Sequence, residues 1–272
     1  MKLTVLADNN TIIDRYYLGE PALSLLLEDD GEKILFDTGY SDVFIRNAEV
    51  LGIDLSGVTT IVLSHGHNDH TGGLRYLMEK YNLAGVTLIC HPRVFERREY
   101  DGLAVGSPVS KEECAACGMT VQCSEAPVKL SSHLTFLGEI PRVTGFESQE
   151  PIGSVMHEGI LMPDYVKDDS AIVYRGEDGL FVITGCSHSG ICNILTHAKS
   201  QPGNERLPVT GVIGGFHLMK DDRQLRETVS FLQQHVAGDL YPCHCVSLYA
   251  KHCLMQAMPV KEIGVGMTLE IR

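Results

Sequence analysis

Four side chains that can bind metal ions lie within one short segment of the sequence: His65, His67, Asp69 and His70. Imidazole nitrogen and carboxylate oxygen suit zinc, and also manganese or iron. Two histidines separated by one residue can bind one ion when the chain between them turns tightly, and the next two side chains can then reach a second ion. Two ions about 3.5–4 Å apart can share a water molecule, lower its pKa and hold an attacking and a leaving oxygen together. The segment therefore predicts a metal centre suited to hydrolysis or group transfer.

The residues around this segment are typical of a loop at the end of a buried strand. Residues 59–63 form an apolar, β-branched run that predicts a short strand. The glycines Gly66, Gly72 and Gly73 allow the backbone to fold tightly enough to direct the ligands inward. A helix is predicted over residues 71–81. We therefore expect the ligands to lie between a strand and a helix.

The rest of the chain alternates strands and helices, which is the pattern of a layered α/β fold. The other predicted strands cover residues 2–7, 22–27, 33–36, 86–90, 134–137, 171–175, 180–184, 209–213, 240–241 and 267–271. The other predicted helices cover residues 42–51, 190–199 and 223–236, with one more after residue 245. Residues 91–157 interrupt the alternation. We expect them to be an elaboration that covers the active site of a single domain, residues 1–272.

The segment His65-Gly66-His67-Asn68-Asp69-His70 resembles the His-x-His-x-Asp-His signature of the metallo-β-lactamase superfamily. Phe36-Asp37-Thr38-Gly39 resembles the upstream Asp-x-Gly strand end of the same superfamily. The resemblance extends over the whole chain and implies a four-layer αβ/βα sandwich with metal ions at one edge. Four later segments resemble the branch that includes the methanopterin-pathway ribofuranosylaminobenzene 5′-phosphate synthase: residues 138–142, 185–190, 214–217 and 242–245.

The superfamily pattern implies two further histidine ligands and a bridging aspartate. His188 and His244 each follow a predicted strand and are the candidates for the two histidines. Where many members have Gly-Asp, this chain has a glycine followed by Cys186. A thiolate can bind zinc, but a cysteine can equally pack as a small buried residue, and Asp168 or Asp169 is the alternative source of a carboxylate. We expect one or two Zn²⁺ ions, with Mn²⁺, Fe²⁺ or Mg²⁺ as alternatives.

Further side chains are candidates for handling the substrate. Asp69 is expected to orient the nucleophile. His217 follows two glycines at a strand end, where it can transfer a proton or merely cap a helix. Five cations are candidates for binding phosphate, although each alone is typical of a solvated surface: Arg93, Arg97, Arg98, Arg142 and Lys167.

The composition limits the partners. A formal net charge of −13 argues against a nucleic-acid partner, which needs a basic surface. It does not exclude a small anionic substrate, because a metal centre is itself a strong positive charge. Neither a signal peptide nor a membrane-spanning segment is visible, and the nine scattered cysteines are typical of reduced thiols in the cytoplasm.

We therefore expect a metal-dependent enzyme that uses an activated water or substrate oxygen on a phosphate- or pyrophosphate-bearing, pterin-like small molecule. A second enzyme hypothesis is hydrolysis of an ester, thioester or lactone, which needs a pocket without converging arginines. A flavodiiron-like redox enzyme is a different class, but 272 residues leave no room for the flavin domain that it normally needs. A non-catalytic metal-binding or sensing protein is the remaining alternative.

Overall fold

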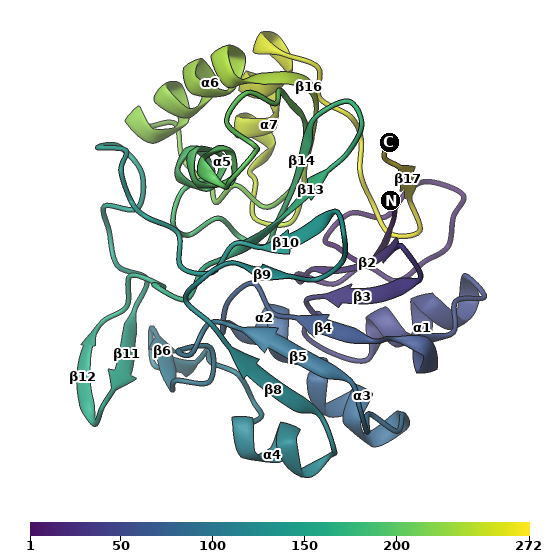
Figure 1. Cartoon of the computed structure of the whole chain (residues 1–272). Helices are drawn as coiled ribbons and strands as arrows, with labels where there is room; N and C mark the ends of the chain where they lie inside the picture. The colour runs from purple at the N-terminus through teal and green to yellow at the C-terminus, as the bar shows by residue number, and fades with distance from the viewer.

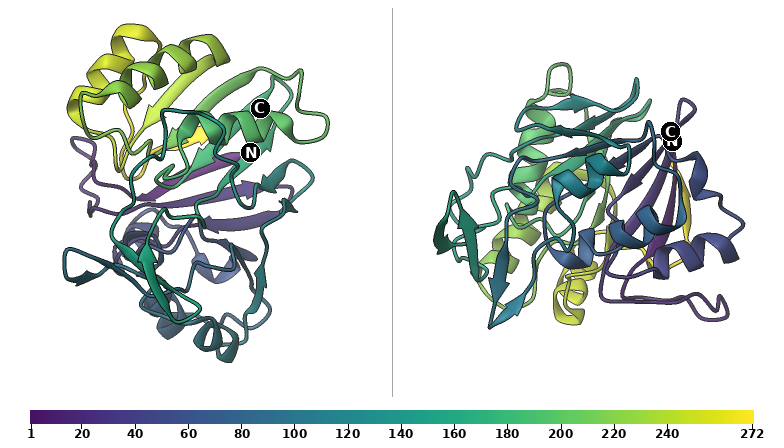
Figure 2. Two further views of the ribbon diagram at one scale, coloured as in Figure 1. Left: turned by 90° about the vertical axis from the view of Figure 1, so that its left-hand side faces the viewer. Right: turned by 90° about the horizontal axis from the view of Figure 1, so that it is seen from below.

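The structure is a computed structural model that describes residues 1–272. Two β-sheets lie face to face, and helices cover the outer face of each sheet (Figure 1). The two further views in Figure 2 show the same order of layers. The chain ends lie side by side, since the amino group of Met1 donates to the backbone oxygen of Ile271 at 2.7 Å. The predicted αβ/βα sandwich is confirmed.

The first sheet has the strand order β17-β1-β2-β3-β4-β5-β8. Its strands are β1 (Lys2–Ala7), β2 (Ser24–Asp29), β3 (Glu32–Phe36), β4 (Thr60–Val62), β5 (Thr87–Cys90), β8 (Thr120–Cys123) and β17 (Thr268–Glu270). The helices of this half are α1 (Val43–Val50), the 3₁₀ turn η1 (Leu55–Gly57), α2 (Asn68–Thr71), α3 (Leu74–Lys80) and α4 (Lys111–Ala116). Strands β3, β4, β5 and β8 are parallel, so their carboxyl ends meet at one edge.

The second sheet has the order β16-β15-β14-β13-β10-β9. Its strands are β9 (Val128–Lys129), β10 (Leu134–Phe136), β13 (Ala171–Arg175), β14 (Leu180–Thr184), β15 (Val209–Gly214) and β16 (Val236–Pro242). Its helices are α5 (Ile191–Ser200), α6 (Arg223–His235) and α7 (Leu248–Ala257). Strands β14, β15 and β16 are parallel, so this sheet also brings several carboxyl ends to one edge.

Both faces of each sheet are buried, and successive residues of one strand belong to different hydrophobic cores. In β3, Ile34 and Phe36 belong to the core between the sheets, whereas Leu35 belongs to the core beneath the helices. In β14, Ile183 faces the other sheet and Val182 faces the helices. Because successive side chains of a strand point to opposite faces, strands buried on both sides appear in the sequence as continuous apolar runs.

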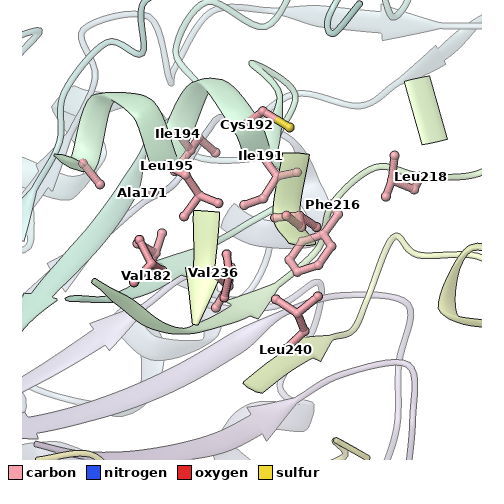
Figure 3. Close-up of a cluster of buried hydrophobic side chains, with 14 of the residues drawn as sticks. Ala171, Val182, Ile191, Cys192, Ile194, Leu195, Phe216, Leu218, Val236 and Leu240 are labelled. Carbon is pink, nitrogen blue, oxygen red and sulfur yellow. The ribbon is translucent and has the colours of Figure 1, made fainter. Parts of the chain in front are cut away.

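The helices bury an apolar stripe against these faces. Ile191, Ile194 and Leu195 of α5 lie in one cluster with Val182 and Leu240 of the sheet (Figure 3). Their spacing of three and four residues places them on one side of the helix. Burial of each such side chain contributes about 1.5–3 kcal/mol, which anchors α5 and the loop that precedes it.

Residues 91–157 are divided among three sheets. Strand β8 is an edge of the first sheet, and β9 and β10 form an edge of the second. A small separate sheet with the order β12-β11-β6-β7 projects from one side (Figure 1). Its strands are β6 (Arg98–Tyr100), β7 (Leu103–Ala104), β11 (Ser154–His157) and β12 (Ile160–Pro163). That the whole range is an elaboration of a single domain stays a prediction.

Most predicted elements agree with the structure, and the differences lie at their ends. The helix predicted over 71–81 corresponds to α3, which begins after Gly72 and Gly73, while the short helix α2 ends at Thr71. Strand β16 begins at Val236, directly after α6, and is longer than the predicted strand. None of the helices is long and apolar enough to cross a membrane.

Candidate metal centre

The predicted metal ligands come from loops at one edge of the two sheets. His65 and His67 follow β4, and His70 lies in α2 directly after them. His188 follows β14, and His244 follows β16. Since the carboxyl ends of parallel strands meet at the same edge of a sheet, loops far apart in sequence become neighbours there.

The structure gathers the seven predicted ligands into two groups. The first group is His65, His67 and His188, and the second is Asp69, His70, Cys186 and His244; within each group the ligand atoms lie within 4.8 Å of one another. Asp168 and Asp169, the alternative carboxylates, belong to neither group. Of the residues considered for the bridging position, only Cys186 lies among the ligand groups, and it belongs to the second group.

The distances within the groups fit one ion each. His65 Nε2 lies 3.0 Å from His67 Nδ1, and His70 Nε2 lies 3.2 Å from both Cys186 Sγ and His244 Nε2. Nitrogen ligands about 2.0–2.1 Å from a tetrahedral zinc ion would lie about 3.3 Å apart. The closest pairs in each group therefore lie near the separation expected of ligands that share one ion.

Asp37 orients two of these histidines. Its carboxylate accepts the Nδ1–H of His70 at 2.7 Å and the hydroxyl of Ser64 at 2.7 Å. Because the only proton of that hydroxyl goes to Asp37, His65 Nδ1 must donate to Ser64 Oγ, 2.9 Å away. In their neutral forms both histidines therefore turn an unprotonated Nε2 toward the centre, as metal ligation requires.

His244 is oriented by the segment that follows β1. Its Nδ1 lies 3.2 Å from Asn9 Oδ1, which can only accept, so Nε2 is the unprotonated atom that faces the second group. Sequence reasoning missed Asn9 and its neighbour Asp8. The feature of the sequence that could have indicated them is the polar run Asp8-Asn9-Asn10, directly after the buried strand β1. This run lies at the same edge as the other loops.

Buried aspartates hold the backbone of every ligand-bearing turn. Each accepts one backbone N–H at 2.7–2.9 Å from a residue at or beside a ligand. The four pairs are Asp37 with Ser64, Asp168 with Gly66, Asp169 with Ser189, and Asp8 with His244. A carboxylate that accepts a backbone N–H fixes the turn more strongly than a neutral acceptor does.

Several buried ring nitrogens have no partner within the protein. They are Nε2 of His67 and both ring nitrogens of His188. An unpartnered buried polar atom costs about 1–3 kcal/mol. A metal ion among His65, His67 and His188 would give His188 the partner that the protein lacks, so the residues present fit a bound ion.

The pKa values of these histidines follow from burial and charge. Burial lowers the pKa of His65 and His188 well below the ordinary value, and that of His67 to about 4. Burial is also the largest single influence on His70, but the carboxylates of Asp69 and Asp37 together outweigh it and the pKa of His70 is raised. Most of the ligand imidazoles are thus neutral at neutral pH, the state that binds metal ions.

A pocket of about 460 Å³ opens over both groups. Besides ligand residues, its walls include Tyr40, Tyr100, Ile152 and Met219, and no lysine or arginine lines it. The surface of the pocket is mainly apolar. Such a pocket suits a neutral, apolar or aromatic part of a small molecule.

His217 lies in this pocket beside the first group. Its ring centroid is 4.6 Å from that of His188, and burial lowers its pKa. Its φ of 47° is left-handed, as are those of Asp37, Ser187 and His244. Such conformations cost about 1–2 kcal/mol per residue. Their concentration at this edge indicates that the fold tolerates strain to direct these side chains.

The cations predicted to bind phosphate do not line the pocket. Arg93 pairs with Glu96 at 2.9 Å, and Arg142 donates to the backbone oxygen of Val166 at 3.0 Å. Arg97 and Lys167 line two other cavities. The structure does not bring Arg93, Arg97, Arg142 and Lys167 to the metal centre. Their predicted role in binding the substrate there does not agree with these positions.

Residues 18–244 match the family model described as the metallo-beta-lactamase superfamily. This match covers most of the chain, and the protein belongs to that superfamily. The predicted resemblance is therefore confirmed.

Individual relatives match along nearly the whole chain. A Methanocaldococcus jannaschii protein named 7,8-dihydropterin-6-methyl-4-(beta-D-ribofuranosyl)-aminobenzene-5'-phosphate synthase is 28% identical over 270 residues, 94% of this chain and 91% of the relative. Another from that organism, "Uncharacterized protein MJ0448", is 29% identical and covers 93% of this chain and 94% of its own length. The crystal structure of Tm1679, described as a metal-dependent hydrolase of the beta-lactamase superfamily, has a TM-score of 0.85 with 29% identity, over 100% of this chain and 99% of that one.

Proposed function

We propose that this protein is a metal-dependent hydrolase that acts on a small ester, thioester or lactone with an apolar or aromatic body. The observation that carries the proposal is the pocket over the two ligand groups, which is mainly apolar and has no lysine or arginine in its walls. Of the two enzyme hypotheses, this is the one that needs a pocket without converging arginines.

His65, His67 and His188 would hold one ion, and Asp69, His70, Cys186 and His244 the other. Such ions, when bound, lower the pKa of water and stabilise developing negative charge. The thiol of Cys186 favours zinc over manganese or magnesium, because sulfur is a poor ligand for hard cations.

The other side chains of the pocket would orient the reactants. Burial raises the pKa of Asp69, but the imidazoles of His70 and His244 outweigh it and keep the carboxylate ionised. Asp69 would accept a hydrogen bond from the attacking water and direct its lone pair. The neutral ring of His217 would hold or return a proton at the leaving oxygen or sulfur.

The test is a substrate panel of neutral esters, thioesters and lactones beside phosphodiesters and pyrophosphates. We expect turnover of the neutral compounds, loss of that turnover on chelation, and recovery with added zinc. His67→Ala and Asp69→Ala should abolish it, whereas His252→Ala, on the exposed side of α7, should not. Turnover that survives both site substitutions would contradict the proposal.

A pterin-like, phosphate-bearing substrate is the second candidate, supported by the name of the relative with 28% identity. Tyr40 and Tyr100 in the pocket walls favour a flat ring, against which aromatic side chains can stack. Turnover of a pterin-bearing pyrophosphate with none of the neutral esters would favour this candidate. No turnover of either kind with bound metal would favour a sensing role, and two irons per chain would favour redox chemistry.

A further inference from the structure

Arg98 is fully buried and its guanidinium is bonded on all sides. Its side chain is only 1% exposed. Its Nε donates to Asp164 at 2.9 Å, and its Nη2 donates to Asp168 at 2.6 Å. The same group donates to the backbone oxygens of Val94 and Arg93, each at 3.1 Å. Arg98 is therefore not available to bind a substrate phosphate, because its guanidinium donates hydrogen bonds within the protein.

This ion pair reaches the metal-binding turn through one backbone group. The second oxygen of Asp168 accepts the N–H of Gly66 at 2.7 Å. Gly66 stands between the ligands His65 and His67. A Cβ on Gly66 would lie 2.1 Å from Arg98 Nη1, so the turn packs directly on the guanidinium. The position of the turn is thus set by Asp168 on one side and Arg98 on the other.

The segment that carries the two carboxylates is itself strained. Val166, between Asp164 and Asp168, has a left-handed φ of 49°, which is unusual for a β-branched residue. Its N–H donates to Asp164 at 2.7 Å, and Arg142 donates to its oxygen. The strained turn allows both carboxylates to reach one guanidinium. One cation and two carboxylates leave a net negative charge beside a centre that binds cations.

We propose that Arg98 and Asp168 are positioning residues that set the metal affinity of the group His65, His67 and His188. The inference rests on the proposed metal centre, but not on any particular substrate. A planar guanidinium presents several donors in a fixed fork, whereas a lysine is a point charge on a flexible stem. Arg98→Lys therefore keeps the charge and removes the geometry, which separates positioning from simple charge compensation.

The test measures metal binding by competition with a chromophoric chelator in the full chain, for the wild type, Arg98→Lys and Asp168→Asn. We expect each variant to bind one of the two ions about 10- to 100-fold more weakly, the usual effect of removing a group that orients a ligand. Cobalt reports on the other ion separately, because Cys186 belongs only to the second group and its thiolate–cobalt charge-transfer band should persist. Urea unfolding of the metal-free proteins measures stability in parallel.

Asp29→Asn is the matched control. Asp29 is also buried and accepts the hydroxyl of Ser131, but it lies at the opposite end of β2 from the metal-binding edge. This variant should lose stability without losing affinity for either ion.

Wild-type affinity for both ions in Arg98→Lys and Asp168→Asn would overturn the inference, as would an equal loss at both sites. If Arg98→Lys does not fold, Asp168→Asn alone decides between these outcomes. A wild-type protein that binds two ions but turns over nothing would refute the proposed function and leave this inference standing. Turnover in the wild type, with normal metal binding in both variants, would refute only this inference.

Discussion

The metal-free protein should lose stability in mild acid because of His67. Burial lowers the pKa of His67 to about 4, against 6.5 for a free histidine. As the pH falls through 6.5, His67 binds a proton in the unfolded chain but not in the folded chain. The free energy of unfolding therefore decreases between these two pKa values. From the two values, His67 alone should lower the free energy of unfolding by about 2 kcal/mol between about pH 7.5 and about pH 5.

Neighbouring groups also change how the free energy of unfolding depends on pH. We therefore predict the difference between the wild type and a variant. The lowered pKa values of His65 and His188 act in the same direction as that of His67. His70 acts in the opposite direction, because a raised pKa adds stability at low pH that is lost as the pH rises. Comparison of the wild type with His67→Gln removes most of these shared contributions.

The assay is urea unfolding of chelator-treated protein at the two pH values. Far-UV circular dichroism is the appropriate signal, since the chain has no tryptophan. The pH-dependent loss of stability should be smaller in His67→Gln than in the wild type by about 2 kcal/mol. His252→Gln, which changes an exposed histidine, should behave as the wild type. Equal pH dependence in the wild type and His67→Gln would refute the reasoning.

Three further substitutions test the packing, the orientation of ligands and the pocket. Gly66→Ala places a Cβ 2.1 Å from the backbone oxygen of Val94, and urea unfolding should show a loss of about 1–3 kcal/mol together with weaker metal binding. Asp37→Asn cannot accept all the hydrogen bonds that orient His70 and the turn before it, and chelator competition should show about 10- to 100-fold weaker metal binding. Ile152→Lys adds a cation to the apolar wall, so kcat/KM for a neutral ester should fall about tenfold relative to an anionic one; an unchanged ratio would mean that Ile152 does not face the substrate.

Much of the fold could be predicted because its signals are local. The apolar runs of β3, β4 and β14 identified strands, and the spacing of Ile191, Ile194 and Leu195 identified a helix. Strand β8 was missed because it is short, and its residues alternate between exposed and half-buried at a sheet edge. Nothing in those four residues distinguishes an edge strand from a loop.

The sequence alone was enough to predict the first ligand loop and its chemistry. His65, His67, Asp69 and His70 lie within one turn, so their residue types and spacing suffice to indicate a metal centre. His188, His244 and Cys186 could be named only as candidates, because their position depends on which strand ends become neighbours.

Only the tertiary structure decided how the ligands divide into two groups and which charges face the pocket. Strand β4 belongs to the first sheet and β14 and β16 to the second, and the packing of the two sheets brings together ligands that lie more than a hundred positions apart in the sequence. In the sequence, a cation such as Arg98 is a candidate for binding phosphate. In the folded chain, its partners Asp164 and Asp168 come from another segment and bind its guanidinium. The role of a long charged side chain is set by its distant partners, and these exist only in the folded chain.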